Sequence, residues 1–256
     1  MKRSLLLCCA ISLFLVAPAY AGINLSWDDC GTAGIGKQEF ACDTNTGAPF
    51  TLVGSLILNP WEQAYDAIVG VSATIAVMGT QEQLPDWWKF GSSGCRGSSA
   101  LTASFDFQDP GPYTCADPWV TQMQGMVSYE ITSATDARIR VAGGLPVGET
   151  VALDGDTEYY MFKVRIARSR STGTGACAGC SMPSCLLLDR ITLHRSAELN
   201  YDIIDTAAID NIAYWHGAYI YIWDDFENHR SGIGCAPDQP TRASRSTWGA
   251  LKSLYR

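Results

Sequence analysis

Basic residues and histidines are scarce in this 256-residue sequence, and long apolar runs are nearly absent. It has 18 lysines and arginines against 26 acidic residues, and three histidines, at positions 194, 216 and 229. Proteins that bind nucleic acid need a basic footprint, so the composition argues against that class. The longest apolar stretch beyond the amino terminus, residues 67–78, is interrupted by Ser72 and Thr74. It is too short for a membrane-spanning helix, which needs about 20 residues.

Short catalytic motifs are missing as well. The sequence contains neither H-E-x-x-H nor G-x-S-x-G, two signatures of metal-dependent and serine hydrolases. Residues 31–37 approach the phosphate-loop pattern, but Gln38 stands where that loop needs a hydroxyl group. Asp28 and Asp29, just before the loop, would also repel a phosphate. We therefore predict a disulfide-closed turn at this point and no nucleotide site.

The amino terminus has the pattern of an export signal. Two basic residues precede an apolar run over residues 5–16, and Ala19-x-Ala21 supplies the small residues of a cleavage site before Gly22. We predict a signal peptide over residues 1–21 and a secreted, periplasmic or cell-surface location, with no transmembrane segment after cleavage. An uncleaved membrane anchor is the alternative. Cleavage leaves 16 basic and 26 acidic residues, a net charge of −10.

Eight cysteines remain after cleavage, and an even number in an exported chain indicates disulfide bonds. These are Cys30, Cys42, Cys95, Cys115, Cys177, Cys180, Cys185 and Cys235. Proximity along the chain predicts the pairs Cys30–Cys42 and Cys95–Cys115. The last four cysteines allow three pairings, among which the sequence does not choose.

The segment Cys177-x2-Cys180-x4-Cys185 leaves two other interpretations open. A C-x-x-C pair is redox-active when its first cysteine begins a helix in a thioredoxin-like fold. Zinc needs four ligands, and Cys235 or His194 could complete the set. The segment lies in a glycine-rich stretch between expected strands, which favours structural disulfides.

Alternation of apolar and polar residues with a period of two dominates the chain and indicates strands with one buried face. Strands are expected over residues 23–27, 50–58, 69–77, 101–108, 127–132, 138–141, 160–166, 186–194 and 218–223. No helix-period segment lies between them, so βαβ units are not expected. We predict an all-β, disulfide-stapled antiparallel β-sandwich, jelly-roll or immunoglobulin-like, as one domain over residues 22–240. A split into two domains near residue 145 is the alternative.

The end of the chain differs in character. Residues 241–256 contain four basic residues and no acidic one. Trp248, Leu251, Leu254 and Tyr255 would share one face of a short amphipathic C-terminal helix. That helix would pack on the acidic sandwich, act as an address for export or surface-attachment machinery, or bind a membrane surface.

The aromatic residues are the best indication of a ligand. Of the eight tryptophans, Trp87 and Trp88 are adjacent in a connection between strands. Exposed indole rings stack on sugar rings, so these two residues are the ligand-binding candidates. The alternative is that they pack in the core or at its edge.

Acidic residues gather in three places. Asp154, Asp156 and Glu158 offer hard oxygen ligands in a turn and are weak calcium candidates; no cofactor other than this calcium is predicted. Paired carboxylates could instead hydrolyse a glycoside. The clusters that could supply them are Asp202, Asp205 and Asp210, and Asp224, Asp225 and Glu227. Since nothing selects one set, no catalytic residue is predicted.

Two segments carry a resemblance. Cys177-x2-Cys180-x4-Cys185 followed by Leu186-Leu187-Leu188, together with the closing TWGALKSLYR, resembles uncharacterised exported proteins of environmental bacteria. The resemblance implies bacterial export and no particular activity. In outline the expected domain is also similar to cohesin-like and carbohydrate-binding sandwiches, a likeness of architecture that assigns no function.

Together these features predict an exported, non-catalytic β-sandwich with a binding, adhesion or surface-structural role. Its partner would be an extracellular glycan or protein. The alternatives are a carbohydrate-binding module that uses Trp87 and Trp88, and a secreted hydrolase with paired carboxylates.

Overall fold

The structure is a computed structural model that describes residues 21–59, 65–108, 113–119, 123–196, 201–225 and 230–238. The expected C-terminal helix and residues 1–20 of the expected signal peptide lie outside these ranges. The described part of the chain is almost entirely strand and turn, with no α-helix. It contains three short 3-10 turns: η1 (Gly31–Ala33), η2 (Asp86–Trp88) and η3 (Ser98–Ala100).

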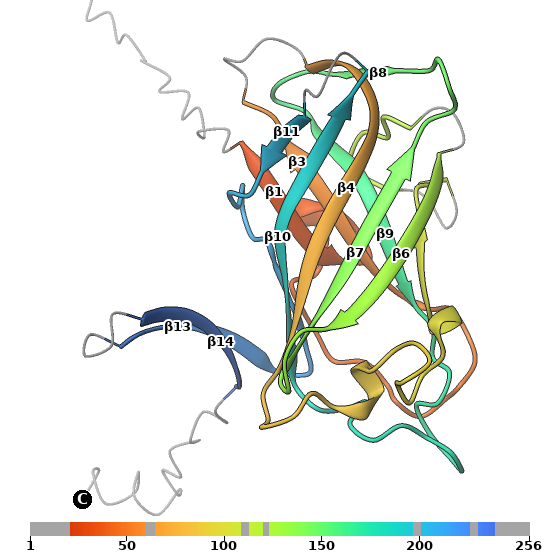
Figure 1. Cartoon of the computed structure of the whole chain (residues 1–256), viewed down its shortest axis with the longest axis vertical. Helices are drawn as coiled ribbons and strands as arrows, with labels where there is room; N and C mark the ends of the chain where they lie inside the picture. The colour runs from red at the N-terminus through yellow and green to blue at the C-terminus, as the bar shows by residue number, and fades with distance from the viewer. Residues whose placement is uncertain are drawn as a thin grey trace, which may run out of the picture.

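Two sheets, antiparallel except for one short parallel pair in the larger sheet, pack face to face and form a sandwich (Figure 1). The smaller sheet has the order β1 (Gly22–Trp27), β3 (Phe50–Ile57), β9 (Glu158–Ile166) and β5 (Leu101–Ser104). The main path of the larger sheet is β2 (Lys37–Gln38), β12 (Ile212–Trp215), β10 (Ser184–Arg195), β4 (Tyr65–Gly79), β7 (Asp136–Gly144) and β6 (Gln124–Ile131). Its side branches are β11 (Tyr201–Ile204), which pairs with β10, and β8 (Val151–Leu153), which pairs with β4.

The period-two alternation of the sequence determines which side chains enter the core. On β4, Val71, Ala73, Ile75 and Val77 are at most 3% exposed and point between the sheets. The residues between them are less buried and lie on the outer face. Each large apolar side chain buried in this way contributes about 1.5–3 kcal/mol. The all-β sandwich expected from the sequence is confirmed.

A cluster of aromatic rings fills the core at one end of the sandwich. Trp215 on β12 stacks on Trp87 at 4.7 Å and contacts Trp27, Phe40 and Phe50 at 4.4–5.6 Å. This cluster joins strands of both sheets to the turn η2 and so stabilises the packing of the two layers.

Arg96 is completely buried beside this cluster. Its guanidinium group lies 4.0 Å from the centre of the Trp87 ring and 4.9 Å from that of Phe90. It donates to the carbonyl oxygens of Trp87 and Ala167. Burial lowers the pKa of Arg96 to about 10, and the two rings compensate part of the cost of desolvation.

Four disulfide bonds join segments that are distant in the sequence. They are Cys30–Cys115, Cys42–Cys180, Cys95–Cys177 and Cys185–Cys235. The expectation of four disulfides is confirmed, but the pairs Cys30–Cys42 and Cys95–Cys115 are wrong. After η1 the chain crosses to the larger sheet, where β2 pairs with β12, and this crossing carries Cys42 away from Cys30. Chain proximity therefore does not predict the pairing.

A two-stranded ribbon, β13 (Ala218–Asp225) and β14 (Arg230–Pro237), projects from the sandwich (Figure 1). Cys185–Cys235 ties its base to the larger sheet, and Ile220 packs near Met78 there. Further out, Ile222 is 77% exposed. Among the described residues there is no helix of sufficient length and apolarity to cross a membrane.

Candidate functional site

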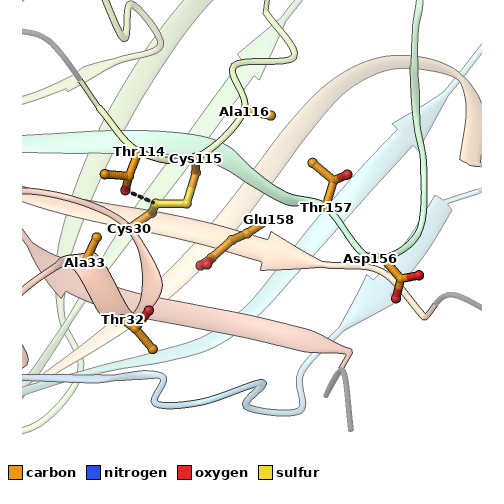
Figure 2. A pocket seen from close by; sticks show the side chains of 9 residues that line it. All are labelled: Cys30, Thr32, Ala33, Thr114, Cys115, Ala116, Asp156, Thr157 and Glu158. Atoms are coloured by element: carbon orange, nitrogen blue, oxygen red, sulfur yellow. Dashed lines mark hydrogen bonds between the residues drawn. A yellow bond between two sulfur atoms is a disulfide. The ribbon is translucent and has the colours of Figure 1, made fainter. Parts of the chain in front are cut away.

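A pocket of about 630 Å³ opens beside the Cys30–Cys115 disulfide (Figure 2). The turn η1, the segment before β9 and the loop that carries Cys115 surround it. Its lining consists of Cys30, Thr32, Ala33, Thr114, Cys115, Ala116, Asp156, Thr157 and Glu158. The lining thus combines hydroxyl groups and two carboxylates with a small apolar patch formed by the disulfide and two alanines.

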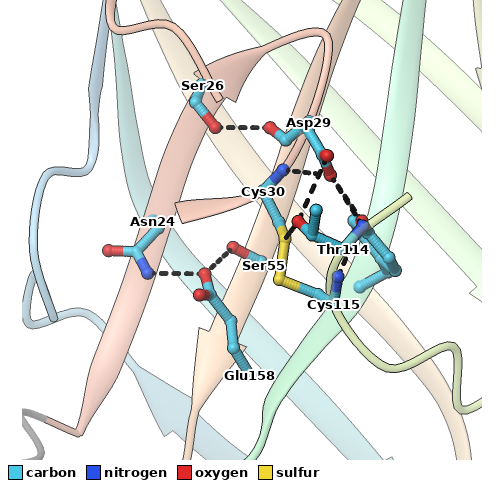
Figure 3. Close-up of a disulfide and its surroundings, with 9 residues drawn as sticks. Asn24, Ser26, Asp29, Cys30, Ser55, Thr114, Cys115 and Glu158 are labelled. Carbon is cyan, nitrogen blue, oxygen red and sulfur yellow. Dashed lines mark hydrogen bonds between the residues drawn. A yellow bond between two sulfur atoms is a disulfide. The ribbon is translucent and has the colours of Figure 1, made fainter. Parts of the chain in front are cut away.

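The carboxylate of Glu158 is held in position by two buried neutral donors (Figure 3). Asn24 Nδ2 donates to Glu158 Oε1 at 2.8 Å, and Ser55 Oγ donates to the same oxygen at 2.6 Å. The three residues come from the neighbouring strands β1, β3 and β9. Asn24 Oδ1 in turn accepts the backbone N–H of Ile209 at 2.9 Å. The carboxylate is therefore oriented before any ligand arrives.

Gly31 is needed for this arrangement. Its φ is +44°, and a Cβ atom at this position would lie 2.3 Å from Glu158 Oε2. A side chain here would displace the carboxylate, so the glycine that resembled part of a phosphate loop instead makes room for Glu158.

A second polar cluster supports the other side of the disulfide. Asp29 accepts hydrogen bonds from the backbone N–H of Cys30 at 2.8 Å, from Thr114 Oγ1 at 3.1 Å and from the Tyr160 hydroxyl. Tyr160 Oη accepts the backbone N–H of Cys115 at 2.9 Å. These bonds connect both ends of the disulfide to the buried ring of Tyr160, so this wall of the pocket is rigid.

The raised pKa of Tyr160 in this cluster predicts that the cluster stabilises the protein less at alkaline pH. Burial, followed by the hydrogen bond to Asp29, raises the pKa of Tyr160 to about 12, against about 10 in an unfolded chain. Burial also raises the pKa of Tyr129. The stability that a raised tyrosine pKa contributes is fully present below about pH 10. It is lost as the pH rises toward the pKa of that tyrosine in the folded protein. The lowered pKa of Arg96 acts in the opposite direction above about pH 10, because the unfolded chain then binds more protons at this group.

We expect the stability difference between the wild type and Tyr160→Phe to shrink as the pH rises from 9 to 11. The variant lacks the hydroxyl group whose ionisation destabilises the wild type. Urea unfolding at each pH measures the difference, and Tyr221→Phe on the exposed ribbon is the control. A difference that stays constant over this range would contradict the assignment.

Trp87 and Trp88, the ligand candidates of the sequence analysis, are both 0% exposed. Trp87 Nε1 donates to Ser171 Oγ at 3.1 Å, and the two rings pack edge to face at 5.1 Å. The expectation of exposed indole rings is wrong, because η2 folds back and places both rings in the core between the sheets. Neither offers a face to a sugar.

The calcium candidates divide between two environments. Asp156 and Glu158 line the pocket, whereas Asp154 lies outside it. Within the described residues, three possible metal-ligand side chains come together at Cys30, Cys115 and Glu158. Two of these atoms are sulfurs bonded to each other, so this group is no metal-ligand set. The structure does not bring the three predicted carboxylates together.

The structure also bears on the zinc, redox and phosphate-loop interpretations of the sequence. Cys177, Cys180, Cys185 and Cys235 are all in disulfides, which removes the zinc site and a Cys177–Cys180 redox pair. Lys37 of the phosphate-loop pattern forms an ion pair with Asp238 at 3.2 Å.

The acidic residues proposed for a hydrolase lie partly outside the described residues. Burial raises the pKa of Asp210, and its carboxylate accepts the Ile212 N–H at 2.9 Å. Glu227 and the side chains of Asp202, Asp224 and Asp225 lie outside the described residues.

Two residues of the candidate site, Asn24 and Ser55, are not predicted by the sequence. Each is an ordinary polar residue in a strand, and neither has a neighbour in the sequence that marks it. The contact with Glu158 joins residues 134 and 103 positions apart. No protein-family model, no curated protein and no solved structure matches this chain.

Proposed function

We propose that this chain is an exported binding protein that takes a polyhydroxylated ligand, a carbohydrate, in the pocket beside Cys30–Cys115. The observation that carries the proposal is the oriented carboxylate of Glu158, fixed by buried Asn24 and Ser55 at the edge of a pocket of about 630 Å³. Binding sites for small ligands are typically 300–1,000 Å³ in volume and contain a few fixed polar groups.

The lining suits sugar hydroxyl groups. A carboxylate accepts hydrogen bonds from two adjacent hydroxyls, and the side chains of Thr32, Thr114 and Thr157 can donate or accept. The disulfide and the methyl groups of two alanines offer contacts for the C–H face of a sugar ring. Since Asp156 and Glu158 are the charged residues of the lining, an amino sugar with its ammonium group is favoured over a uronic acid.

The proposed export also has support. Four disulfide bonds are typical of proteins that fold in an oxidising compartment. The amino-terminal pattern of a signal peptide accounts for entry into such a compartment. A mass spectrum of the exported protein would test whether it begins at Gly22.

A second candidate surface is a groove of about 290 Å³ on the outer face of the larger sheet. Its charged lining residues are Arg140 and Arg190, which lie on either side of Thr74 because both pair with it across β4. Two guanidinium groups beside a hydroxyl group fit a carboxylate or a sulfate, which would compete with Glu130 for its ion pair with Arg140 at 3.0 Å. This groove favours an acidic polysaccharide, the opposite of the ligand expected in the pocket.

Binding of oligosaccharides separates these proposals. The purified protein is tested against chitosan, neutral glucan and polyuronate oligosaccharides, and affinities are then measured by calorimetry. We expect chitosan oligosaccharides to bind and Asp156→Asn or Glu158→Gln to weaken binding about tenfold, the value of one hydrogen bond to a charged group. Asn is tolerated at residue 156, whose φ is +65°.

The matched control is Asp154→Asn, which changes the same turn outside the pocket and should leave the affinity unchanged. Equal binding by all three variants would contradict the assignment to the pocket. Binding of polyuronate that is lost in Arg190→Gln and retained in Asp156→Asn would assign the ligand to the groove instead.

A further inference from the structure

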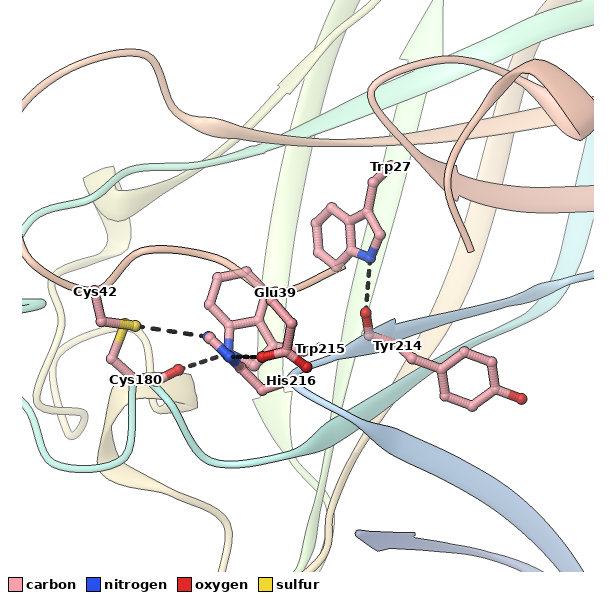
Figure 4. Close-up of polar contacts among 7 residues, drawn as sticks. All are labelled: Trp27, Glu39, Cys42, Cys180, Tyr214, Trp215 and His216. Carbon is pink, nitrogen blue, oxygen red and sulfur yellow. Dashed lines mark hydrogen bonds and ion pairs between the residues drawn. A yellow bond between two sulfur atoms is a disulfide. The ribbon is translucent and has the colours of Figure 1, made fainter. Parts of the chain in front are cut away.

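A histidine and a glutamate are aligned on the Cys42–Cys180 disulfide (Figure 4). His216 Nδ1 lies 2.7 Å from Glu39 Oε2, and His216 Nε2 lies 3.8 Å from Cys42 Sγ. Carboxylate, imidazole and sulfur thus follow one another in the order found in reactive cysteine sites, with the sulfur held in a disulfide.

This alignment follows from the parallel pairing of β2 and β12, the one such pair among the strands of the described residues. β2 and β12 run side by side, with Gln38 opposite Trp215. Glu39 and His216 are the next residues on the two strands, so they leave the pair as neighbours. The backbone N–H of His216 donates to the Gln38 carbonyl oxygen at 3.2 Å, which fixes the point where the strands end.

The histidine is held in a single orientation. Its side chain is 10% exposed, and its ring lies 5.2 Å from Trp215 and 6.5 Å from Phe40. Its φ is +53°, in the left-handed region that only a few per cent of non-glycine residues adopt. Strained backbone of this kind concentrates at functional sites. Glu39, by contrast, is exposed and acts on the orientation of the ring.

We infer that Cys42–Cys180 is the redox-labile disulfide of this protein and that its reduction exposes Cys42 as a reactive thiolate, a site for exchange with disulfides and for S-thiolation. A cationic imidazole beside a cysteine stabilises its thiolate. Stabilising the reduced form makes a disulfide a stronger oxidant. Of the two histidines that the structure describes, His194 contacts Ser72, so His216 is the one that lies against a disulfide.

The reaction balances with a dithiol as reductant. One thiolate of the dithiol attacks the S–S bond, which breaks: one cysteine forms a mixed disulfide with the dithiol and the other leaves as a thiolate. The second thiol of the dithiol then attacks the mixed disulfide, closes the disulfide of the oxidised reductant and releases the remaining cysteine. Two electrons pass to Cys42 and Cys180. Of the two protons released by the dithiol, one stays on the Cys180 thiol and the other on His216, which leaves an imidazolium beside the Cys42 thiolate. A later disulfide partner would be attacked by that thiolate.

The test uses the full oxidised protein in buffers with graded ratios of reduced to oxidised dithiothreitol at one pH. Free thiols are blocked with N-ethylmaleimide and each cysteine is quantified by peptide mass spectrometry. We expect Cys42 and Cys180 to be reduced at a ratio at least about tenfold less reducing than the other three disulfides require. Cys95–Cys177 is the internal control, because Cys177 lies in the same loop as Cys180.

Two variants test whether His216, and not merely the solvent exposure of the disulfide, makes Cys42–Cys180 easy to reduce. His216→Asn keeps a residue that tolerates positive φ and cannot carry a charge, and it should shift the midpoint of Cys42–Cys180 about tenfold toward more reducing buffer. Glu39→Gln, at an exposed position, should shift it in the same direction by a smaller factor. Thermal melting of the oxidised variants checks that the fold is retained.

A second measurement follows the thiolate itself. After reduction, Cys42 should react with iodoacetamide about tenfold faster than Cys180, and His216→Asn should abolish the difference. The inference is overturned if Cys42–Cys180 is reduced together with or after the other disulfides. It is also overturned if His216→Asn leaves both the midpoint and the alkylation rate unchanged. Neither result depends on the ligand proposed for the pocket.

Discussion

Trp87→Ala is expected to lower the free energy of unfolding by about 4 kcal/mol, as large aromatic truncations in a core do. The indole is 0% exposed and stacks on Trp215 at 4.7 Å, so its removal leaves a cavity at the centre of the aromatic cluster. Arg96, whose guanidinium group lies 4.0 Å from this ring, loses part of what compensates its burial. For a chain of this size, the melting temperature should fall by about 10 °C.

Lys89→Ala is the matched control for this prediction. Lys89 is two residues further along, and its ion pair with Asp86 at 2.9 Å lies at the surface. Such pairs contribute about 0–1 kcal/mol, so urea unfolding should hardly change. If Trp87→Ala were as stable as Lys89→Ala, the ring would not be in the core, and its exposure to a ligand would have to be considered again.

Replacing Cys30 and Cys115 together by alanine is expected to cost about 4 kcal/mol. The bond spans 85 positions of sequence, and in the chain-entropy model a loop of that length is worth about 4–5 kcal/mol through its restriction of the unfolded chain. The bond also holds the loop of Thr114 and Ala116 against η1, so the pocket should lose its shape and its proposed ligand affinity. Urea unfolding and calorimetric titration of the double variant measure both effects.

Ala33→Ser with Ala116→Ser alters the same two loops and retains the disulfide. This control should unfold close to the wild type. A double cysteine variant that unfolds like this control would show that Asp29, Thr114 and Tyr160 hold the two loops together without the disulfide.

The pocket could not have been found by reading along the chain. Asp154, Asp156 and Glu158 stand at alternate positions of one expected turn, and this spacing of carboxylates suggested calcium. The orientation of the Glu158 carboxylate depends instead on Asn24. Asn24 donates a hydrogen bond to Glu158 Oε1 and lies 134 positions away in the sequence, on another strand. The ligand-binding hypothesis for Trp87 and Trp88 was wrong for the same reason. A sequence pattern gives the chemical type of a side chain and does not give its exposure.

Taken alone, the sequence determined the class of structure: alternation along segments such as residues 69–77 specifies a strand with one buried face, and an even cysteine count specifies disulfides. Both are local or compositional properties, which each segment carries whatever its neighbours are. The tertiary structure alone decided that Cys42 bonds to Cys180, that Trp87 is buried and that His216 faces a sulfur atom. These facts depend on which segments meet in space, and contacts across 138 or 174 positions leave no periodic trace in the chain.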